Sequence, residues 1–252
     1  MLPAKYGRMG VKMLQSAFQD LDMDQDDTSV QMVKEVISAL PTEHPVHNYF
    51  KFAPVSAQSD AALAATFLQG PERNYSVDEC LDLVASAGLV FQGWFLKAPY
   101  YPHDWFMSGS PLDQAMSALP EAKLWSVVER LHVMNGSHFF MACRSDRPKK
   151  AYAIDFSTNE CMDYVPKMRM RSGIEDQEIY RPNWRTGVTP AQMLFLQFVN
   201  GRRTIRQIAD RVAKSGESLR VGNLEEFGRR LFESLWRLDF AAMTLKENPG
   251  RN

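Results

Sequence analysis

The chain has 252 residues, of which 45% are hydrophobic and 23% are charged, and its formal net charge is -1. This composition is typical of a globular protein with enough apolar surface for two cores, and the charge balance gives no global reason to expect nucleic acid or a membrane as a partner. Three widely spaced cysteines without CxxC spacing indicate neither a disulfide framework nor a zinc knuckle. No apolar run reaches the roughly 18 residues of a spanning helix, so we expect a soluble, cytoplasmic protein.

The first seventy residues carry three helical patterns separated by breakers. Apolar side chains at helical spacing predict helices over residues 11–21, 29–40 and 59–68. The acidic run between the first two helices alternates as in a calcium loop. However, Asp27 stands where the sharp turn needs glycine, and Val33 stands where a bidentate Glu is needed. The preferred interpretation is a solvated loop whose Asp or Thr side chains cap the next helix.

Two histidines, His44 and His47, lie three residues apart around Pro45. A proline between them favours an extended turn, and apart from Glu43 no further ligand-type residue stands at suitable spacing. We therefore expect structural histidines and assign no metal ligand anywhere in the chain.

The clearest local pattern lies in residues 67–102. Ser76 and Glu79 have capping-box spacing, and the apolar residues that follow predict a helix that ends before a left-handed Gly88. The predicted buried stripe of this helix is Leu81, Leu83, Val84 and Ala87. Residues 89–96 are apolar on both faces, which predicts a strand covered by helices on either side of a sheet.

Several short segments, in this order, resemble the C-terminal half of a bacterial group of class I S-adenosylmethionine-dependent methyltransferases. They are Lys5-Tyr6-Gly7-Arg8-Met9-Gly10-Val11, Met13-Leu14-Gln15, the turn from Leu40-Pro41 to His44-Pro45, Arg73-Asn74-Tyr75-Ser76-Val77, Ala87-Gly88-Leu89 and Ala98-Pro99-Tyr100. The resemblance covers about the first hundred residues. It implies part of a Rossmann-like methyltransferase domain.

The family binds its methyl donor with a glycine-rich turn after the first strand and an acidic residue after the next. No two glycines in this chain are separated by a single residue, so the glycine turn is not present. The resemblance therefore implies the acceptor side of a methyltransferase that binds no cofactor by itself and would use S-adenosylmethionine if an N-terminal half were supplied. A truncated start and a surviving non-enzymatic remnant are both open interpretations, and the chain's own enzymatic activity is undecided.

The resemblance also suggests residues near the acceptor's entrance. Candidate substrate-lip residues are Tyr6, Arg8, Tyr100, Tyr101 and His103. For the aromatic side chains, a packed lid over the sheet edge is the favoured alternative, because aromatic clusters usually reflect burial. No catalytic residue is assigned.

A second domain is expected after residue 108, so that the chain divides into residues 1–108 and 109–252. Apolar spacing predicts two short helices over 112–119 and 124–133. A hairpin within 136–170 is expected from strands at 138–143 and 151–156, with a third partner near 164–170. The fold class is α+β.

The sequence of the C-terminal tail, residues 189–246, predicts three helices and a strand. The helices begin at Thr189, Thr204 and Leu224, and the strand covers residues 240–245, which together resemble a winged-helix unit over 189–246. The run from Asn200 to Ala209 also resembles PqqD-like peptide-chaperone domains. The alternative function is thus a non-enzymatic module that binds a protein or peptide through residues 189–246.

The tail is locally basic. Between Gly201 and Arg237 there are nine Arg and Lys residues against five acidic ones, a surplus of 9 - 5 = 4. Phosphate contacts would use such a surplus, but Glu225, Glu226, Arg229 and Arg230 stand at pairing spacing. A solvated helix face with ion pairs is therefore preferred to nucleic-acid binding, and homo-oligomerisation is an open alternative.

Overall fold

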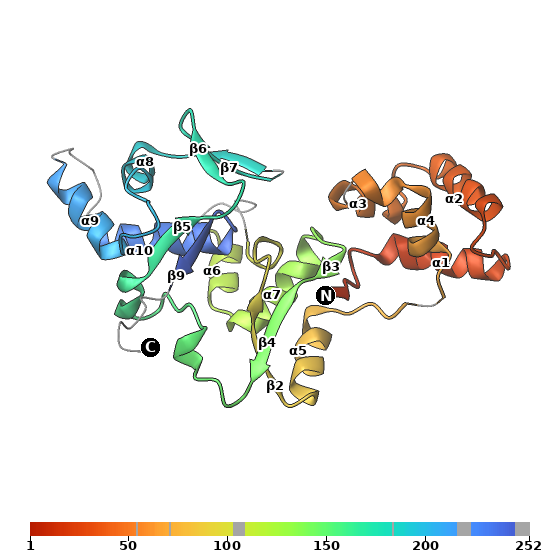
Figure 1. Ribbon diagram of the computed structural model, residues 1–252, viewed down its shortest axis with the longest axis horizontal. Coiled ribbons are helices and arrows are strands. Elements are labelled where there is room, and N and C mark those ends of the chain that lie inside the picture. Colours follow the sequence, from red (N-terminus) through yellow and green to blue (C-terminus); the bar gives the residue numbers. More distant parts are fainter. Residues whose placement is uncertain (54, 71, 103–108, 183, 216–222, 245–252) are drawn as a thin grey trace. The chain divides into compact units, whose positions relative to one another are not determined.

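The fold was examined in a computed structural model, which describes all residues except 54, 71, 103–108, 183, 216–222 and 245–252. It combines helices and strands, as expected for an α+β protein (Figure 1). Two compact units are present. Unit 1 comprises Met1–Phe95 and Asp104–Ser145, and unit 2 comprises Leu96–His103 and Asp146–Asn252.

The first part of unit 1 is helical. Its elements are α1 (Met9–Asp20), α2 (Asp27–Ala39), α3 (Pro45–Phe52), a 3-10 turn (Val55–Gln58) and α4 (Asp60–Phe67). Their apolar faces form one core, which contains Val11, Leu14, Phe18, Val30, Val33, Val46 and Phe67. The three helices expected here are confirmed, and Asp26 caps α2 by accepting a hydrogen bond from the Ser29 N–H.

Helix α3 corrects the extended turn expected around Pro45. Proline is well tolerated at the first position of a helix, where its missing N–H has no helical acceptor. His44 is the N-cap, and its Nδ1 accepts a hydrogen bond from the Val46 N–H at 3.2 Å. His47 Nε2 lies 3.3 Å from the Leu40 carbonyl oxygen. Both histidines therefore have structural contacts.

Gly10 brings α1 and α3 into close contact. A Cβ atom at this position would lie 2.1 Å from the Val46 backbone nitrogen. The start of α3 therefore packs directly on the α1 backbone, and only glycine leaves the space for it.

The second part of unit 1 combines helices with two short antiparallel pairs. The helices are α5 (Val77–Ser86), α6 (Pro111–Ser117) and α7 (Glu121–Leu131). Strand β1 (Leu2–Pro3) pairs with β3 (Ser137–His138), and β2 (Leu89–Trp94) pairs with β4 (Phe140–Arg144). The predicted capping box of α5 is confirmed, and Gly88 has the expected positive φ of 68°.

We expected the strand at residues 89–96 to be covered on both faces, but strand β2 has one exposed face. Strands β2 and β4 form a two-stranded ribbon whose inner face carries Phe91, Trp94 and Phe140. The Phe91 and Phe140 rings stack at 5.8 Å, and Trp94 meets Trp125 of α7 at 5.7 Å. Side-chain alternation turns the other residues outward. This outer face of the β2–β4 ribbon consists of Val90, Phe95, Phe139 and Met141, which are 37%, 55%, 38% and 42% exposed.

The stripe predicted for α5 is also partly wrong. Val84 is buried, but Leu83 is 41% exposed, and the buried residues on the same helix are Val77 and Cys80. The helix is rotated relative to the expectation because its buried side faces α7 and β2.

The hairpin expected within 136–170 is not formed. Strand β4 pairs with β2, and residues 149–151 form a 3-10 turn in place of a second strand. The aromatic pairing of β2 with β4 determines this choice of partner, which lies about fifty residues away in the chain. Unit 1 also contains α6, α7 and β4. The division into units therefore differs from the expected division after residue 108.

In its described residues, unit 2 contains three helices and two small antiparallel sheets. The helices are α8 (Pro190–Leu196), α9 (Ile205–Lys214) and α10 (Leu224–Arg237), with 3-10 turns at Ala98–Tyr100, Lys149–Ala151 and Asn159–Asp163. Strand β5 (Val165–Met168) pairs with β9 (Ala241–Thr244). Strands β6 (Gly173–Glu175), β7 (Glu178–Arg181) and β8 (Trp184–Gly187) form a meander.

The tail helices follow the sequence closely. Thr189 and Thr204 each form a capping box, and the predicted stripe of α9, Ile205, Ile208, Ala209 and Val212, is fully buried. These residues share one core with Phe195, Phe232 and Phe240.

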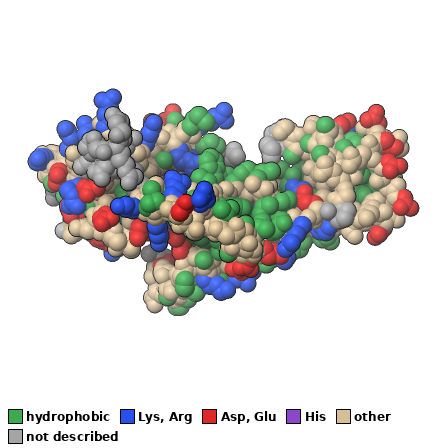
Figure 2. Space-filling view, turned by 60° about the horizontal axis from the view of Figure 1, so that its bottom comes forward, with side chains coloured by type: hydrophobic (Ala, Val, Ile, Leu, Met, Phe, Trp, Pro, Cys, Tyr) green, Lys and Arg blue, Asp and Glu red, His purple; other side chains and the backbone are tan. Residues whose placement is uncertain are grey.

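Four of the nine basic side chains of the tail form ion pairs with described acidic residues of the tail. Arg229 and Arg230 contact Glu226 and Arg237 contacts Glu233 at helical spacing, and Arg206 contacts Glu225 on the next helix. Basic side chains are conspicuous over the part that carries α8 to α10, whereas acidic ones gather over the α1 to α4 part (Figure 2).

Gly10→Ala should destabilise unit 1 although alanine is the better helix former. The new methyl group would overlap the α3 backbone, and we expect a loss of about 1–3 kcal/mol in the free energy of unfolding, measured by urea denaturation. Gly70→Ala is the matched control, because nothing lies within 4 Å of a Cβ there. Equal stability of the two variants would contradict the close contact.

Candidate functional site

The turn Tyr6-Gly7-Arg8 makes close contacts with other parts of unit 1. Arg8 donates from Nε and Nη2 to the two carboxylate oxygens of Glu72 at 2.8 and 3.3 Å, and its guanidinium lies 5.3 Å from the Tyr49 ring centre. A Cβ on Gly7 would lie 1.8 Å from the Asn135 carbonyl oxygen, so the turn fits only glycine there. Tyr6 is half-buried beside them.

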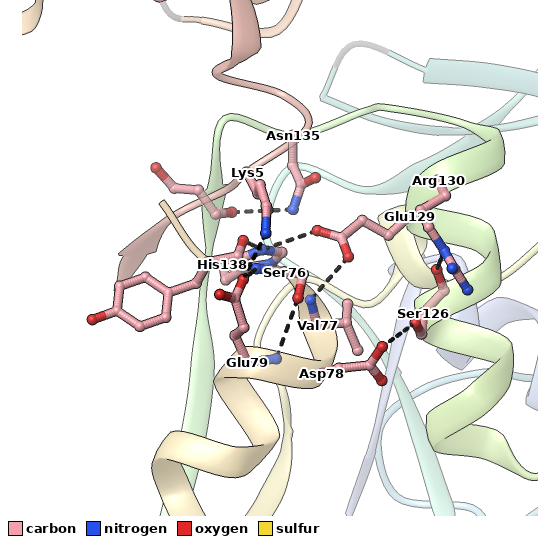
Figure 3. A network of polar contacts seen from close by, with 12 residues as sticks. Lys5, Ser76, Val77, Asp78, Glu79, Ser126, Glu129, Arg130, Asn135 and His138 are labelled. Carbon is pink, nitrogen blue, oxygen red and sulfur yellow. Dashed lines mark hydrogen bonds and ion pairs between the residues drawn. The ribbon is translucent and has the colours of Figure 1, made fainter. Parts of the chain in front are cut away.

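A buried polar network lies at the N-terminus of α5 (Figure 3). The Val77 N–H donates to Glu129 Oε2 at 2.9 Å. His138 Nε2 lies 2.8 Å from the Tyr75 carbonyl oxygen and 3.2 Å from Glu129 Oε1. Because a carbonyl oxygen only accepts, His138 Nε2 carries a proton. The network therefore joins α5, α7 and β3.

Polar contacts around this network reinforce the start of α5. Ser76 and Glu79 exchange the two capping-box hydrogen bonds, and Lys5 Nζ lies 3.5 Å from Glu79. Ser126 Oγ donates to Asp78 at 2.7 Å. Acidic side chains here also complement the positive end of the helix dipole.

The His138 and Glu129 side chains have the composition of an acid–base pair, but they are almost completely buried, with exposed fractions of 0% and 3%. A proton carrier must reach its substrate within hydrogen-bond distance. In this arrangement the pair stabilises the fold and does not present itself to a ligand.

The sequence did not lead us to identify Glu129 or His138 as parts of such a network. A signal was present for the carboxylate: Glu129 stands four residues after the buried Trp125 and so lies on the buried side of α7. An acidic residue on that side indicates a buried partner.

The aromatic lip residues Tyr100 and Tyr101 belong to unit 2, whereas Tyr6 and Arg8 belong to unit 1. Tyr100 and Tyr101 are 1% and 2% exposed. The Tyr101 ring contacts Trp236 at 6.4 Å and lies 4.9 Å from the Arg237 guanidinium. This arrangement corresponds to the packed alternative, and a role at a substrate entrance remains a prediction. His103 lies outside the described residues.

Asp239 organises a second charged centre, wholly within unit 2. It is 5% exposed, and its φ of 63° is in the left-handed region, which Asp tolerates better than most residues. Its Oδ2 accepts from the Lys97 and Ala98 N–H groups at 2.7 and 2.8 Å. Its Oδ1 contacts Lys97 Nζ at 3.1 Å and also accepts from Arg169 Nη1.

Lys97 is held in this centre at some electrostatic cost. Burial lowers the pKa of its ammonium group, and the Asp239 carboxylate opposes this shift. The ammonium also lies 5.2 Å from the Trp236 ring centre. Sequence reasoning missed both residues, because Asp239 lies 142 positions from Lys97 and no local pattern relates them.

The described ranges contain neither a metal-binding cluster nor a membrane-spanning helix. No group of three or more His, Cys, Asp or Glu side chains there is placed to hold a metal ion. No helix in the same ranges is long and apolar enough to cross a membrane.

The three cysteines are free thiols in different environments. Burial raises the pKa of Cys80 to about 12, with the nearby Glu129 and Glu79 carboxylates adding to the shift. Burial also raises the pKa of Cys161. Cys143 is half-buried on β4 and pairs in register with Val90.

Structural comparison identifies a solved protein with a similar fold. No protein-family model matches it. The structure of PKMT2 from Rickettsia typhi matches with a TM-score of 0.62 and 10% identity, over 98% of this chain and 51% of that one. PKMT2 in complex with AdoHcy matches with a TM-score of 0.58 and 12% identity, over 98% and 52%. The chain thus spans about half the length of PKMT2 and shares the fold of that part.

Glu129→Gln should weaken unit 1 by about 2 kcal/mol in the free energy of unfolding. The amide can still accept from the Val77 N–H, but its NH₂ group then faces the protonated His138 Nε2, donor against donor. Asp82→Asn on the exposed side of α5 is the control and should change stability by less than about 0.5 kcal/mol. Unchanged stability of Glu129→Gln in urea denaturation would rule out the proposed role.

Cys143 should be the first thiol to react with iodoacetamide at pH 8. The thiolate is the nucleophile, and Cys80 and Cys161 are buried with raised pKa values. Mass spectrometry of the native protein should show labelling of Cys143 well before the other two, and labelling in guanidinium should equalise them. Fast labelling of Cys80 in the native state would contradict the described burial.

Proposed function

We propose that this chain forms the acceptor-side portion of a protein methyltransferase whose methyl donor is bound by residues outside it. The observation that carries the proposal is the match of 98% of the chain to about half of PKMT2, a protein-lysine methyltransferase that has also been solved with AdoHcy. The absence of any GxG turn from the sequence favours assigning donor binding to other residues.

The chemistry is compatible with such a division. Methyl transfer needs an in-line approach of the acceptor to the methyl group, so orientation of the acceptor contributes most of the rate acceleration. An acceptor-side portion therefore contributes by holding a protein substrate in place, without supplying an acid or base. Tyr6, beside the rigid Arg8 turn, is a candidate contact, and we retain Tyr100, Tyr101 and His103 as proposed acceptor-side residues.

The outer face of the β2–β4 ribbon has the character of a surface that another portion of a protein covers. Its side chains, Val90, Phe95, Phe139 and Met141, are all more than a third exposed. Contiguous exposed apolar side chains usually mark a surface that another structural element covers. We propose that the donor-binding portion packs on this face.

A second candidate is a peptide-binding module formed by residues 189–246, with the winged-helix-like and PqqD-like character that the sequence suggests. The specific observation is that β9, which lies in this module, pairs only with β5 among described residues, so β9 has a free edge. An extended peptide can add a strand to such an edge. The two candidates differ in whether a donor-binding portion restores methyl transfer.

The chain alone should show no saturable AdoHcy binding by calorimetry at ligand concentrations up to about 1 mM. A donor-binding portion supplied as a separate protein should bind the chain and, with it, transfer methyl groups to a lysine-bearing protein. Micromolar AdoHcy binding by the chain alone would contradict the division of labour.

The Val90→Asp and Met141→Asp variants test the packing surface. Each should weaken association with the donor-binding portion by more than about tenfold, because a charge would be buried in an apolar contact. Leu21→Asp is the control, since Leu21 is 64% exposed at the end of α1. Association that is unaffected by all three substitutions would place the contact elsewhere.

A further inference from the structure

Arg181 in unit 2 has an unusual environment for a cation. It ends β7 and pairs in register with Trp184 at the start of β8. Its guanidinium carbon lies 4.8 Å from the Trp184 ring centre and 5.8 Å from that of Phe240. The two rings lie 5.2 Å apart. Aromatic side chains therefore restrict the movement of the guanidinium.

The polar contacts of Arg181 are incomplete. It forms no ion pair with a described carboxylate, its Nε is buried without a hydrogen-bond acceptor, and its one hydrogen bond is a long contact of 3.4 Å from Nη1 to the Pro182 carbonyl oxygen. Burial lowers the pKa of Arg181. A guanidinium has five N–H donors, so most of its capacity for binding oxygen is unused.

The nearest carboxylate cannot supply the missing acceptor. Asp239 already accepts from the Lys97 and Ala98 N–H groups, from Lys97 Nζ and from Arg169. The Asp239 carboxylate attracts the charge of Arg181 electrostatically, and Arg169 opposes this attraction. Arg181 thus lies near a carboxylate whose oxygens are already engaged by other donors.

We propose that Arg181 is the anchor of an oxyanion-binding site that takes a phosphate or carboxylate group. The edge formed by Nε and Nη2 matches two oxygens of such a group, which is the geometry of bidentate arginine recognition. Because the side chain as a whole is only half-buried, a small rotation brings this edge to the ligand. Trp184 and Phe240 limit the rotation.

The site is independent of methyl transfer. It lies within unit 2 and uses none of the residues proposed for packing the donor-binding portion. Inorganic phosphate and acetate are suitable probes, since they separate tetrahedral from planar oxyanions. Both should be compared with chloride at constant ionic strength, because general screening affects every surface charge.

Calorimetric titration of the full chain with phosphate or acetate should give a saturable site with a dissociation constant on the order of 1 mM for at least one probe. Arg181→Gln should weaken that binding about tenfold or more, through loss of the charge-assisted pair. Arg185→Gln is the matched control on β8, because Arg185 already pairs with Glu175 and Glu178. It should bind as the unsubstituted chain does.

The Arg181→Lys variant distinguishes loss of the binding site from loss of the fold. It keeps the positive charge and loses the paired donors, so it should melt near the temperature of the unsubstituted chain in chloride and still bind phosphate and acetate several-fold more weakly. No saturable binding of either probe by the unsubstituted chain, or equal binding by the Arg181→Gln and Arg185→Gln variants, would overturn the proposal.

Discussion

The buried carboxylate of Glu129 is the contact on which the centre of unit 1 depends. It comes from α7, accepts the Val77 N–H at the start of α5 and faces His138 at the end of β3. An isolated buried carboxylate is strongly unfavourable, and charge-assisted hydrogen bonds together with the positive end of α5 offset that cost. These partners come from sequence positions more than fifty residues apart. These contacts connect α5, α7 and the short β1–β3 pair.

Asp239 has the corresponding role in unit 2. Its left-handed backbone turns the chain from α10 into β9 while its side chain binds the backbone of Lys97 and Ala98. The segment that follows β2 is thereby fastened into the second unit, and Tyr100 and Tyr101 pack in its interior. Asp239 therefore forms the turn after α10 and also makes the long-range hydrogen bonds to Lys97 and Ala98. The same carboxylate is fully used by these donors, which explains why Arg181 beside it has no acid to pair with.

The proposed methyltransferase role and the proposed oxyanion site rest on different features. The first depends on the fold shared with half of PKMT2 and on the exposed outer face of the β2–β4 ribbon. The second depends on a guanidinium held between two rings with unused donors. A protein that holds a substrate for a donor bound elsewhere needs rigid surfaces more than catalytic groups. The two buried carboxylates supply rigidity of this kind in each unit.

The sequence by itself determined the local elements. The capping box at Ser76, the helix starts at Thr189 and Thr204, the left-handed Gly88 and the stripe of α9 are encoded within a few neighbouring residues, and all are found as expected. Only the tertiary structure decided the strand partners, the helix that begins at Pro45 and the burial of Glu129 and Asp239. Pairing of β2 with β4 replaced the expected hairpin because aromatic contacts between distant segments outweigh proximity in the chain. Local hydrogen bonds are readable from spacing, whereas long-range partners are selected by packing, which spacing does not record.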